Sequence, residues 1–212
     1  MQLIGMLDSP YVRRTAISLE CLGLPFAHQP VSVFSTFDQF RGINPVVKAP
    51  TLVCDDGEVL MDSSLILQYA EARCAGRKSL WPQDAAELQH DLRAVGLALA
   101  ACEKSVQIVY ERNLRPQAFQ YAPWLARVTG QLRAAYAGLE QEVGKRRAVF
   151  VGPLHQAAIT TAVAWQFTQS MLAEIVAATA HPALADLSAR LEKTPEFLKY
   201  PPTGPGVVAP AN

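Results

Sequence analysis

The stretch that says most about the fold is residues 48–64, which read KAPTLVCDDGEVLMDSS. An apolar, β-branched run begins at Pro50 and is closed by an Asp-Asp-Gly turn at 55–57, after which a second extended run reaches Met61. Two such runs around a short Asp-Gly turn are typical of a β-hairpin. A helix follows at once from Asp62-Ser63, so these residues predict a strand, a strand and a helix in succession.

Pro50 stands at the first residue of this hairpin. A proline is tolerated there, but it removes a hydrogen-bond donor and restricts the residue before it. If the Ala49–Pro50 bond is cis, the backbone N–H and C=O of Ala49 can pair with an extended ligand instead of a neighbouring strand. With a carboxylate and a helix N-terminus nearby, this edge suits a small, charged, peptide-like ligand.

The residues before the hairpin alternate between strand and helix patterns. Gln2 to Leu7 is strand-like, and residues 10–22 have helical spacing that stops at Gly23, a good C-terminal cap. Residues 27–34 are extended again. A strand, helix, strand unit implies a parallel pair, and a following hairpin adds antiparallel strands. We therefore expect a thioredoxin-like domain over residues 1–78.

After residue 82 the pattern becomes purely helical. Apolar residues step by three and four from Leu88 to Val109, and again from Leu125 to Val143. No charged residue occurs between Arg147 and Glu174, so a helix over about 156–173 must be buried on most faces. The fold class we expect is an α+β thioredoxin-like domain followed by an all-α helical bundle over residues 84–212, with 76–82 as the linker.

The composition narrows the class of protein. Half of the 212 residues are hydrophobic, 18% are charged and the net charge is zero, which argues against nucleic-acid or anionic membrane partners. The chain carries neither a signal-peptide pattern nor an apolar run of the roughly 18 residues that a membrane span needs. Its four cysteines are scattered without a CxxC pair, which favours buried free thiols and no metal site. We expect a soluble, cytoplasmic protein.

Three motifs in this order carry a family resemblance. They are SPYVR at 9–13, NPVVKAP at 44–50 and DSSLILQY at 62–69, followed by the helical half. Over nearly its whole length the chain resembles the cytosolic glutathione transferase superfamily, in particular bacterial glutathione S-transferase-like proteins with a serine in the first motif. The resemblance implies the glutathione transferase fold, reduced glutathione as co-substrate, no metal, a homodimer and a role in detoxification.

The resemblance makes Ser9 the catalytic residue. At the start of the first helix, a hydroxyl can donate to the glutathione sulfur and hold it as thiolate. The alternative is that Ser9 is an ordinary helix N-cap. Arg13, one turn later, could add positive field or form a salt bridge elsewhere. Because a serine cannot form a mixed disulfide, the glutaredoxin-like activity of cysteine-type relatives is disfavoured.

The same resemblance assigns the glutathione-binding residues. Ala49, before a cis Pro50, pairs through its backbone with the cysteinyl part, and Lys48 reaches the glycyl carboxylate. Asp62 takes the γ-glutamyl amino group, while Ser63 and its helix N-terminus take the carboxylate. The alternatives are a trans proline, a solvated lysine and a simple N-cap. Val47 and Ala49 depart from the family's usual glycine and branched residue, and His155 stands where a Ser/Thr-x-x-Asp capping box usually starts the buried helix.

The second substrate is expected above Ser9, against Tyr11, Phe34, Val106 and Tyr110, with Phe37 and Trp165 as further candidates. These side chains favour a small hydrophobic electrophile, although core packing is an alternative for each. Three functions compete: a transferase that conjugates glutathione to that electrophile, a glutathione-binding protein with little turnover, and a protein-interaction module that retains the fold. The presence of Ser9, Pro50, Asp62 and Ser63 together argues against the third.

Overall fold

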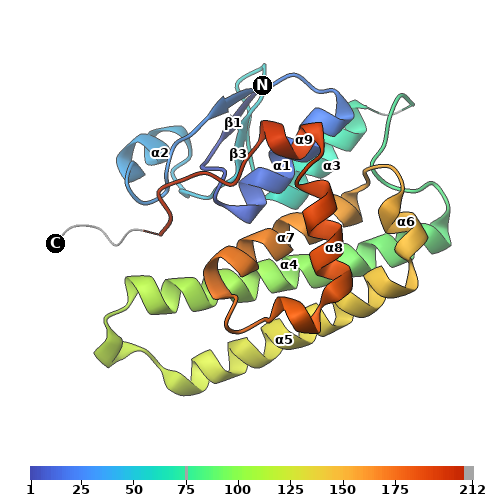
Figure 1. Cartoon of the computed structure of the whole chain (residues 1–212). Helices are drawn as coiled ribbons and strands as arrows, with labels where there is room; N and C mark the ends of the chain where they lie inside the picture. The colour runs from blue at the N-terminus through green and yellow to red at the C-terminus, as the bar shows by residue number, and fades with distance from the viewer. Residues whose placement is uncertain (75, 208–212) are drawn as a thin grey trace. The chain divides into compact units, whose positions relative to one another are not determined.

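The computed structural model describes residues 1–74 and 76–207 (Figure 1). The chain divides into two compact units. The first combines Met1–Leu80 with the segment that begins at Pro195, and the second is Trp81–Thr194. The mixed sheet lies in the first unit and the long helices in the second, which confirms the expected fold class.

The first unit is built on a four-stranded sheet. Its strands are β1 (Gln2–Ile4), β2 (Ala27–Gln29), β3 (Thr51–Val53) and β4 (Val59–Met61), in the order β2-β1-β3-β4. β1 pairs parallel with β2 and antiparallel with β3, and β3 and β4 form the antiparallel hairpin expected around the Asp-Gly turn. This is the mixed strand order of a thioredoxin-like domain.

Four helices accompany the sheet: α1 (Pro10–Leu22), α2 (Phe37–Ile43), α3 (Ser63–Arg73) and α9 (Pro195–Lys199). α1 begins with proline at its first turn and ends at Gly23, whose φ of 71° provides the left-handed cap that the sequence predicts. It packs against α3 and α9, and it is buried along most of its length. α1 is therefore the helix around which the first unit is assembled.

The second unit is a helical bundle in which α4 packs against both α5 and α7 (Figure 1). Its elements are α4 (Ala85–Leu114), η1 (Gln117–Phe119), α5 (Ala122–Lys145), α6 (Arg147–Val151), α7 (Gln156–Leu172), η2 (Ala178–Ala180) and α8 (Pro182–Leu191). None of residues 81–194, all of which are described, lies in a strand. The buried Tyr136 donates towards Ala164 O at 2.8 Å and contacts Thr168 Oγ1 at 2.7 Å, so α5 is tied to α7.

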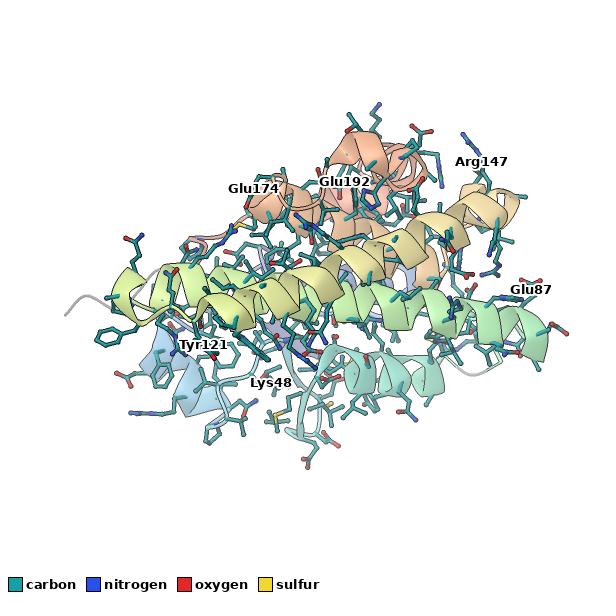
Figure 2. The ribbon with its side chains drawn as sticks, turned by 90° about the horizontal axis from the view of Figure 1, so that it is seen from below. Lys48, Glu87, Tyr121, Arg147, Glu174 and Glu192 are labelled. Carbon is teal, nitrogen blue, oxygen red and sulfur yellow. The ribbon has the colours of Figure 1, made fainter. Side chains whose placement is uncertain are left out.

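α7 is the buried rod that its lack of charge predicts, but its N-terminus is held in an unexpected way. His155 occupies the N-cap position without a side-chain cap, and its Nδ1 lies 2.8 Å from Asp91 Oδ2 on α4. The same carboxylate accepts from Arg146 at 2.9 Å, and Arg146 also pairs with Glu87. Figure 2 labels Glu87 near the start of α4. Burial raises the pKa of Asp91, but His155 and Arg146 lower it below its ordinary value.

Two expectations about the second half need correction. The apolar stripe expected from Leu88 to Val109 includes Leu92, yet Leu92 is 52% exposed, because the buried face follows the neighbouring small residues Ala94, Ala98 and Ala101. The helical domain was expected to run to residue 212, whereas the described segment from Pro195 packs with the first unit. The contact between α9 and α1 accounts for this return.

Candidate functional site

Ser9 lies immediately before α1, with extended backbone angles and a partly exposed side chain. Its carbonyl accepts the first helical hydrogen bond from Arg13 N at 2.9 Å, so it occupies the N-cap position. Its hydroxyl, however, makes no capping hydrogen bond to the helix. The Ser9 hydroxyl is therefore not used as a helix cap, and it lies at the N-terminus of α1, where the helix dipole favours an anion.

Gly5 brings the start of α1 close to the loop before β3. It has a φ of 138°, which side-chain-bearing residues rarely adopt. A Cβ placed on it would lie 2.6 Å from Val12 Cγ2 and 3.2 Å from Ala49 Cβ. Glycine is therefore required here, and its small size allows the first turn of α1 and Ala49 to approach the same point.

The loop that contains Ala49 has the geometry that the sequence predicts at Pro50. The Ala49–Pro50 bond is cis, which confirms that expectation. Within the described residues, the backbone N–H and C=O of Ala49 make no hydrogen bond. Val47 adopts a φ of 52°, a left-handed conformation that is unusual for a β-branched residue and that the glycine implied by the family resemblance would adopt without strain.

Asp62 forms the N-terminus of α3 and meets Lys48 across the loop. Its Oδ1 accepts from Ser64 N at 2.9 Å, and its Oδ2 lies 3.8 Å from Lys48 Nζ. Both side chains are about half exposed, and Figure 2 labels Lys48. Asp62 has a φ of 74°, and strained non-glycine residues of this kind are found most often at binding sites. The pair offers one cation and one anion to a ligand.

Arg14 supplies a positive charge that the sequence analysis missed. It is 1% exposed, and its Nη1 donates to the Ser63 hydroxyl at 3.0 Å and to the Ser64 hydroxyl at 3.3 Å. Ser63 is itself buried, whereas Ser64 is exposed. Because Arg14 fills a lone pair of Ser63 Oγ, the hydrogen of that hydroxyl is free to be donated. The sequence signal for this buried charge is the adjacent pair Arg13 and Arg14 in α1, a helix whose other residues are mostly uncharged.

Arg13 and Asp8 define the charge environment on the other side of α1. Arg13 is also buried, and its Nε donates to Tyr200 O at 2.8 Å while its guanidinium stacks on the Phe197 ring. Arg13 is therefore engaged with α9 and the residues after it. Burial raises the pKa of the Asp8 carboxyl, an effect that N–H groups of Gly206, Ser9 and Asp8 itself oppose.

The expected substrate-pocket residues belong to different units. Tyr11 and Phe34 lie in the first unit, where both are partly buried. Val106 and Tyr110 lie on α4 in the second, and Tyr110 is 39% exposed. Their common pocket stays a prediction. Trp165 packs edge-on against the Tyr136 ring inside the helical bundle and is 4% exposed, so it belongs to the core.

Comparisons with known proteins point to one family. A family model described as the N-terminal domain of glutathione S-transferase matches residues 3–78. The uncharacterized GST-like protein YibF of Escherichia coli K12 is 34% identical over 71 residues, and this match covers 34% of the chain and 35% of YibF. The match therefore spans about a third of that relative's length.

Solved structures extend the similarity to the whole chain. A glutathione transferase family member from Pseudomonas fluorescens Pf-5, with bound glutathione, is 28% identical, with a TM-score of 0.84 over 96% of this chain and 99% of that one. A glutathione S-transferase from Methylobacterium radiotolerans, in complex with glutathione sulfonate, is 26% identical, with a TM-score of 0.86 over 100% and 99%.

Residues 3–78 thus match the N-terminal domain of glutathione S-transferase, and the chain as a whole is similar to solved glutathione transferases. Its thioredoxin-like unit and its helical unit together form the glutathione transferase fold. Among the described residues of this glutathione transferase-like protein, no three metal-ligating side chains cluster as a metal site would require. No helix found in residues 1–74 and 76–207 is long and apolar enough to cross a membrane.

Proposed function

We propose that this protein binds reduced glutathione and conjugates it to a small hydrophobic electrophile. The observation that carries the proposal is the arrangement around the first two turns of α1. Ser9 presents a hydroxyl that does not cap its helix, Val12 meets Ala49 across Gly5, and Arg14 holds Ser63. A hydroxyl, unpaired backbone groups and a buried cation therefore surround one short helical segment.

Each part of the tripeptide has a complementary group in this arrangement. The backbone of Ala49, beside Pro50, pairs with the cysteinyl residue of glutathione in the manner of a β-strand. Asp62 takes the γ-glutamyl amino group, and Lys48 takes the glycyl carboxylate. The ligand thus replaces the single Lys48–Asp62 ion pair, 3.8 Å long, by two ion pairs. Neither side chain is left unpaired on binding.

The γ-glutamyl carboxylate lies at the N-terminus of α3 in this proposal. Ser63 donates its hydroxyl hydrogen and its backbone N–H, and the helix dipole adds to the attraction. The guanidinium of Arg14 donates to the hydroxyls of Ser63 and Ser64. A buried positive charge beside the carboxylate strengthens these hydrogen bonds because the surroundings have a low dielectric.

The chemistry begins with loss of the thiol proton to solvent. The Ser9 hydroxyl donates a hydrogen bond to the resulting thiolate, and the first-turn N–H groups of α1 add their partial positive charge. The thiolate then forms a carbon–sulfur bond with the electrophile, and a leaving group departs with its electron pair or, in an addition, the product takes a proton from water. Ser9 itself forms no covalent bond.

The electrophile is proposed to contact Tyr11 and Phe34, which lie in the same unit as Ser9. The bound molecules of similar proteins support a glutathione thioether as the product. The Pseudomonas fluorescens protein was also solved with S-(propanoic acid)-glutathione, at 28% identity to this chain. A homodimer, a cytoplasmic location and a role in detoxification complete the proposal.

Glutathione binding without turnover is the second candidate, because the roles proposed for Lys48, Ala49, Asp62 and Ser63 serve binding rather than chemistry. Calorimetric titration with reduced glutathione, followed by a panel of aryl halides and activated alkenes, separates the two. Asp62→Ala should weaken binding by about tenfold, since it removes a charged partner. The matched control is Asp84→Ala, another aspartate at a helix N-terminus, which caps α4 only. Equal affinities in wild type and Asp62→Ala would refute the binding mode.

A further inference from the structure

The segment after α9 runs back along α1 towards Ser9. We call residues 200–206 the strap. Tyr200 begins it near the C-terminal end of α1, where its hydroxyl donates to Glu20 at 2.9 Å and Lys199 pairs with the same carboxylate. In Figure 1 the red α9, which precedes the strap, lies beside the blue α1.

The start of the strap is anchored by buried contacts. The carbonyl of Tyr200 accepts from Arg13 Nε, and the Tyr200 ring stacks on Phe26 with centroids 5.6 Å apart. Phe197, one turn earlier, is 1% exposed beneath the Arg13 guanidinium. These contacts explain why α9 stays with the first unit, but they end at Tyr200.

Beyond Tyr200 the strap is exposed up to Gly206, so burial of apolar surface does not hold it. It is held by the residue that precedes Ser9. Asp8 N donates to Thr203 O at 3.1 Å, and Asp8 Oδ2 accepts from Gly206 N at 2.8 Å. A Cβ on Gly204 would lie 2.1 Å from Asp8 Oδ2, so only glycine permits this approach.

The Asp8 carboxylate is partly desolvated, because partial burial disfavours its charged form and raises its pKa. N–H groups from the strap and from the Ser9 turn compensate by binding the carboxylate. The carboxylate therefore joins two segments about 200 residues apart in sequence, and one of them is the turn that carries the Ser9 hydroxyl.

We propose that the strap is a positioning element of the active site, acting through Asp8 to fix the turn that presents Ser9 and the N-terminus of α1 to the thiol. This inference rests on the proposed function, since it concerns the same thiolate. Asp8 and Gly204 are positioning residues and touch no substrate. Their effect falls on the thiolate and on turnover, and leaves the groups that bind the rest of glutathione unchanged.

Three variants test the proposal. Asp8→Ala removes the acceptor, Asp8→Asn keeps an oxygen acceptor, and Gly204→Ala places a methyl group where the carboxylate lies. Gly130→Ala is the matched control, because a Cβ there meets nothing within 4 Å. Thermal unfolding is recorded for each variant. The readouts are the glutathione dissociation constant, the pH titration of the bound thiolate by ultraviolet absorbance, and kcat against KM.

For Asp8→Ala and Gly204→Ala we expect the bound-thiol pKa to rise by about one unit and kcat to fall about tenfold, since a small misplacement of a catalytic group has effects of this size or larger. Glutathione affinity should change less than about twofold, and Asp8→Asn should restore most of the loss. The Gly130→Ala variant should match wild type. An unchanged thiol pKa and kcat in Asp8→Ala would overturn the proposal, as would an equal loss in Gly130→Ala.

Failure of the proposed function has a different signature. If the wild type binds no glutathione, the transferase proposal fails, and amide hydrogen exchange at Ser9, Tyr11 and Val12 then decides the role of the strap. Faster exchange there in Asp8→Ala and Gly204→Ala, with Gly130→Ala at the wild-type rate, supports the positioning role. Identical exchange in all four proteins overturns it.

Discussion

Substitution of Ser9 by alanine separates the two roles that this residue could have. Both roles use the same hydroxyl. Loss of a helix cap would lower the stability of the fold, whereas loss of a hydrogen-bond donor to the thiolate would raise the pKa of the bound thiol. In the structure the Ser9 hydroxyl does not cap α1, so its removal breaks no capping hydrogen bond. The free energy of unfolding should therefore change by less than about 0.5 kcal/mol, against about 1 kcal/mol for loss of a true cap.

The expected loss appears in the bound thiol instead. A hydrogen bond to a charged acceptor contributes about 1.5–3 kcal/mol, which corresponds to about one to two pKa units. A free thiol titrates near about 8.5, so Ser9 should bring bound glutathione to about 6.5–7.5, and Ser9→Ala should return it towards the free value. At neutral pH the thiolate fraction, and with it the conjugation rate, should fall about tenfold or more.

The assay is the ultraviolet absorbance of the bound thiolate against pH, with chemical denaturation of the same samples. Asp84→Ala is the comparison variant, because Asp84 accepts from Ala86 N and Glu87 N at 3.0 Å and so caps α4. It should lose stability and keep the wild-type thiolate titration. Superimposable titrations for wild type and Ser9→Ala would refute the reasoning and leave the thiolate to the N–H groups of α1.

Arg14→Met should weaken glutathione binding about tenfold and lower the free energy of unfolding by about 1–3 kcal/mol, since it leaves the Ser63 hydroxyl without its partner. Calorimetry measures the affinity and chemical denaturation the stability. Wild-type affinity in the variant would contradict the role of Arg14 in glutathione binding. Asp91→Asn should cost about 3 kcal/mol at neutral pH. Because the folded pKa of Asp91 is lowered, its stabilisation is present above its unfolded pKa and is lost as pH falls through the folded value. The denaturation midpoints of wild type and variant should therefore converge below about pH 4. A constant gap between them would argue against the His155 pair. Light scattering should give a mass of about twice the 23.1 kDa of one chain. Leu65 is 60% exposed on α3, and Leu65→Glu should reduce the measured mass to that of one chain. A monomeric wild type would exclude the homodimer.

The sequence predicts well those elements whose signals are local. The bounds of α1 follow from a proline at its first turn, apolar spacing and a terminal Gly23. The hairpin follows from its Asp-Gly turn, and the burial of α7 follows from the missing charges. By contrast, the sequence does not predict α2, because its seven residues have mixed polarity and carry little periodic signal.

The site was predicted in part for the same reason. Ser9, Asp62 and Ser63 stand at helix starts, which short motifs mark, and Lys48 lies in the motif that leads to Pro50. Arg14 was missed because nothing in its neighbours along the chain shows that it meets Ser63, which is 49 residues away. The adjacent arginines indicate that a charge is buried in this helix, but they do not identify the partner of Arg14.

Sequence alone thus determined the strand, helix, strand and hairpin order of the first unit apart from α2, the change from mixed to helical structure, and the motifs that resemble those of glutathione transferases. Only the tertiary structure decided which charges pair and where the last residues go. Asp91 holds His155 across 64 residues, and Asp8 holds Gly206 across 198. The physical reason is range: capping, turn and periodicity signals act over a few residues, whereas a buried ion pair or a returning segment depends on groups that only the folded chain brings within hydrogen-bond distance.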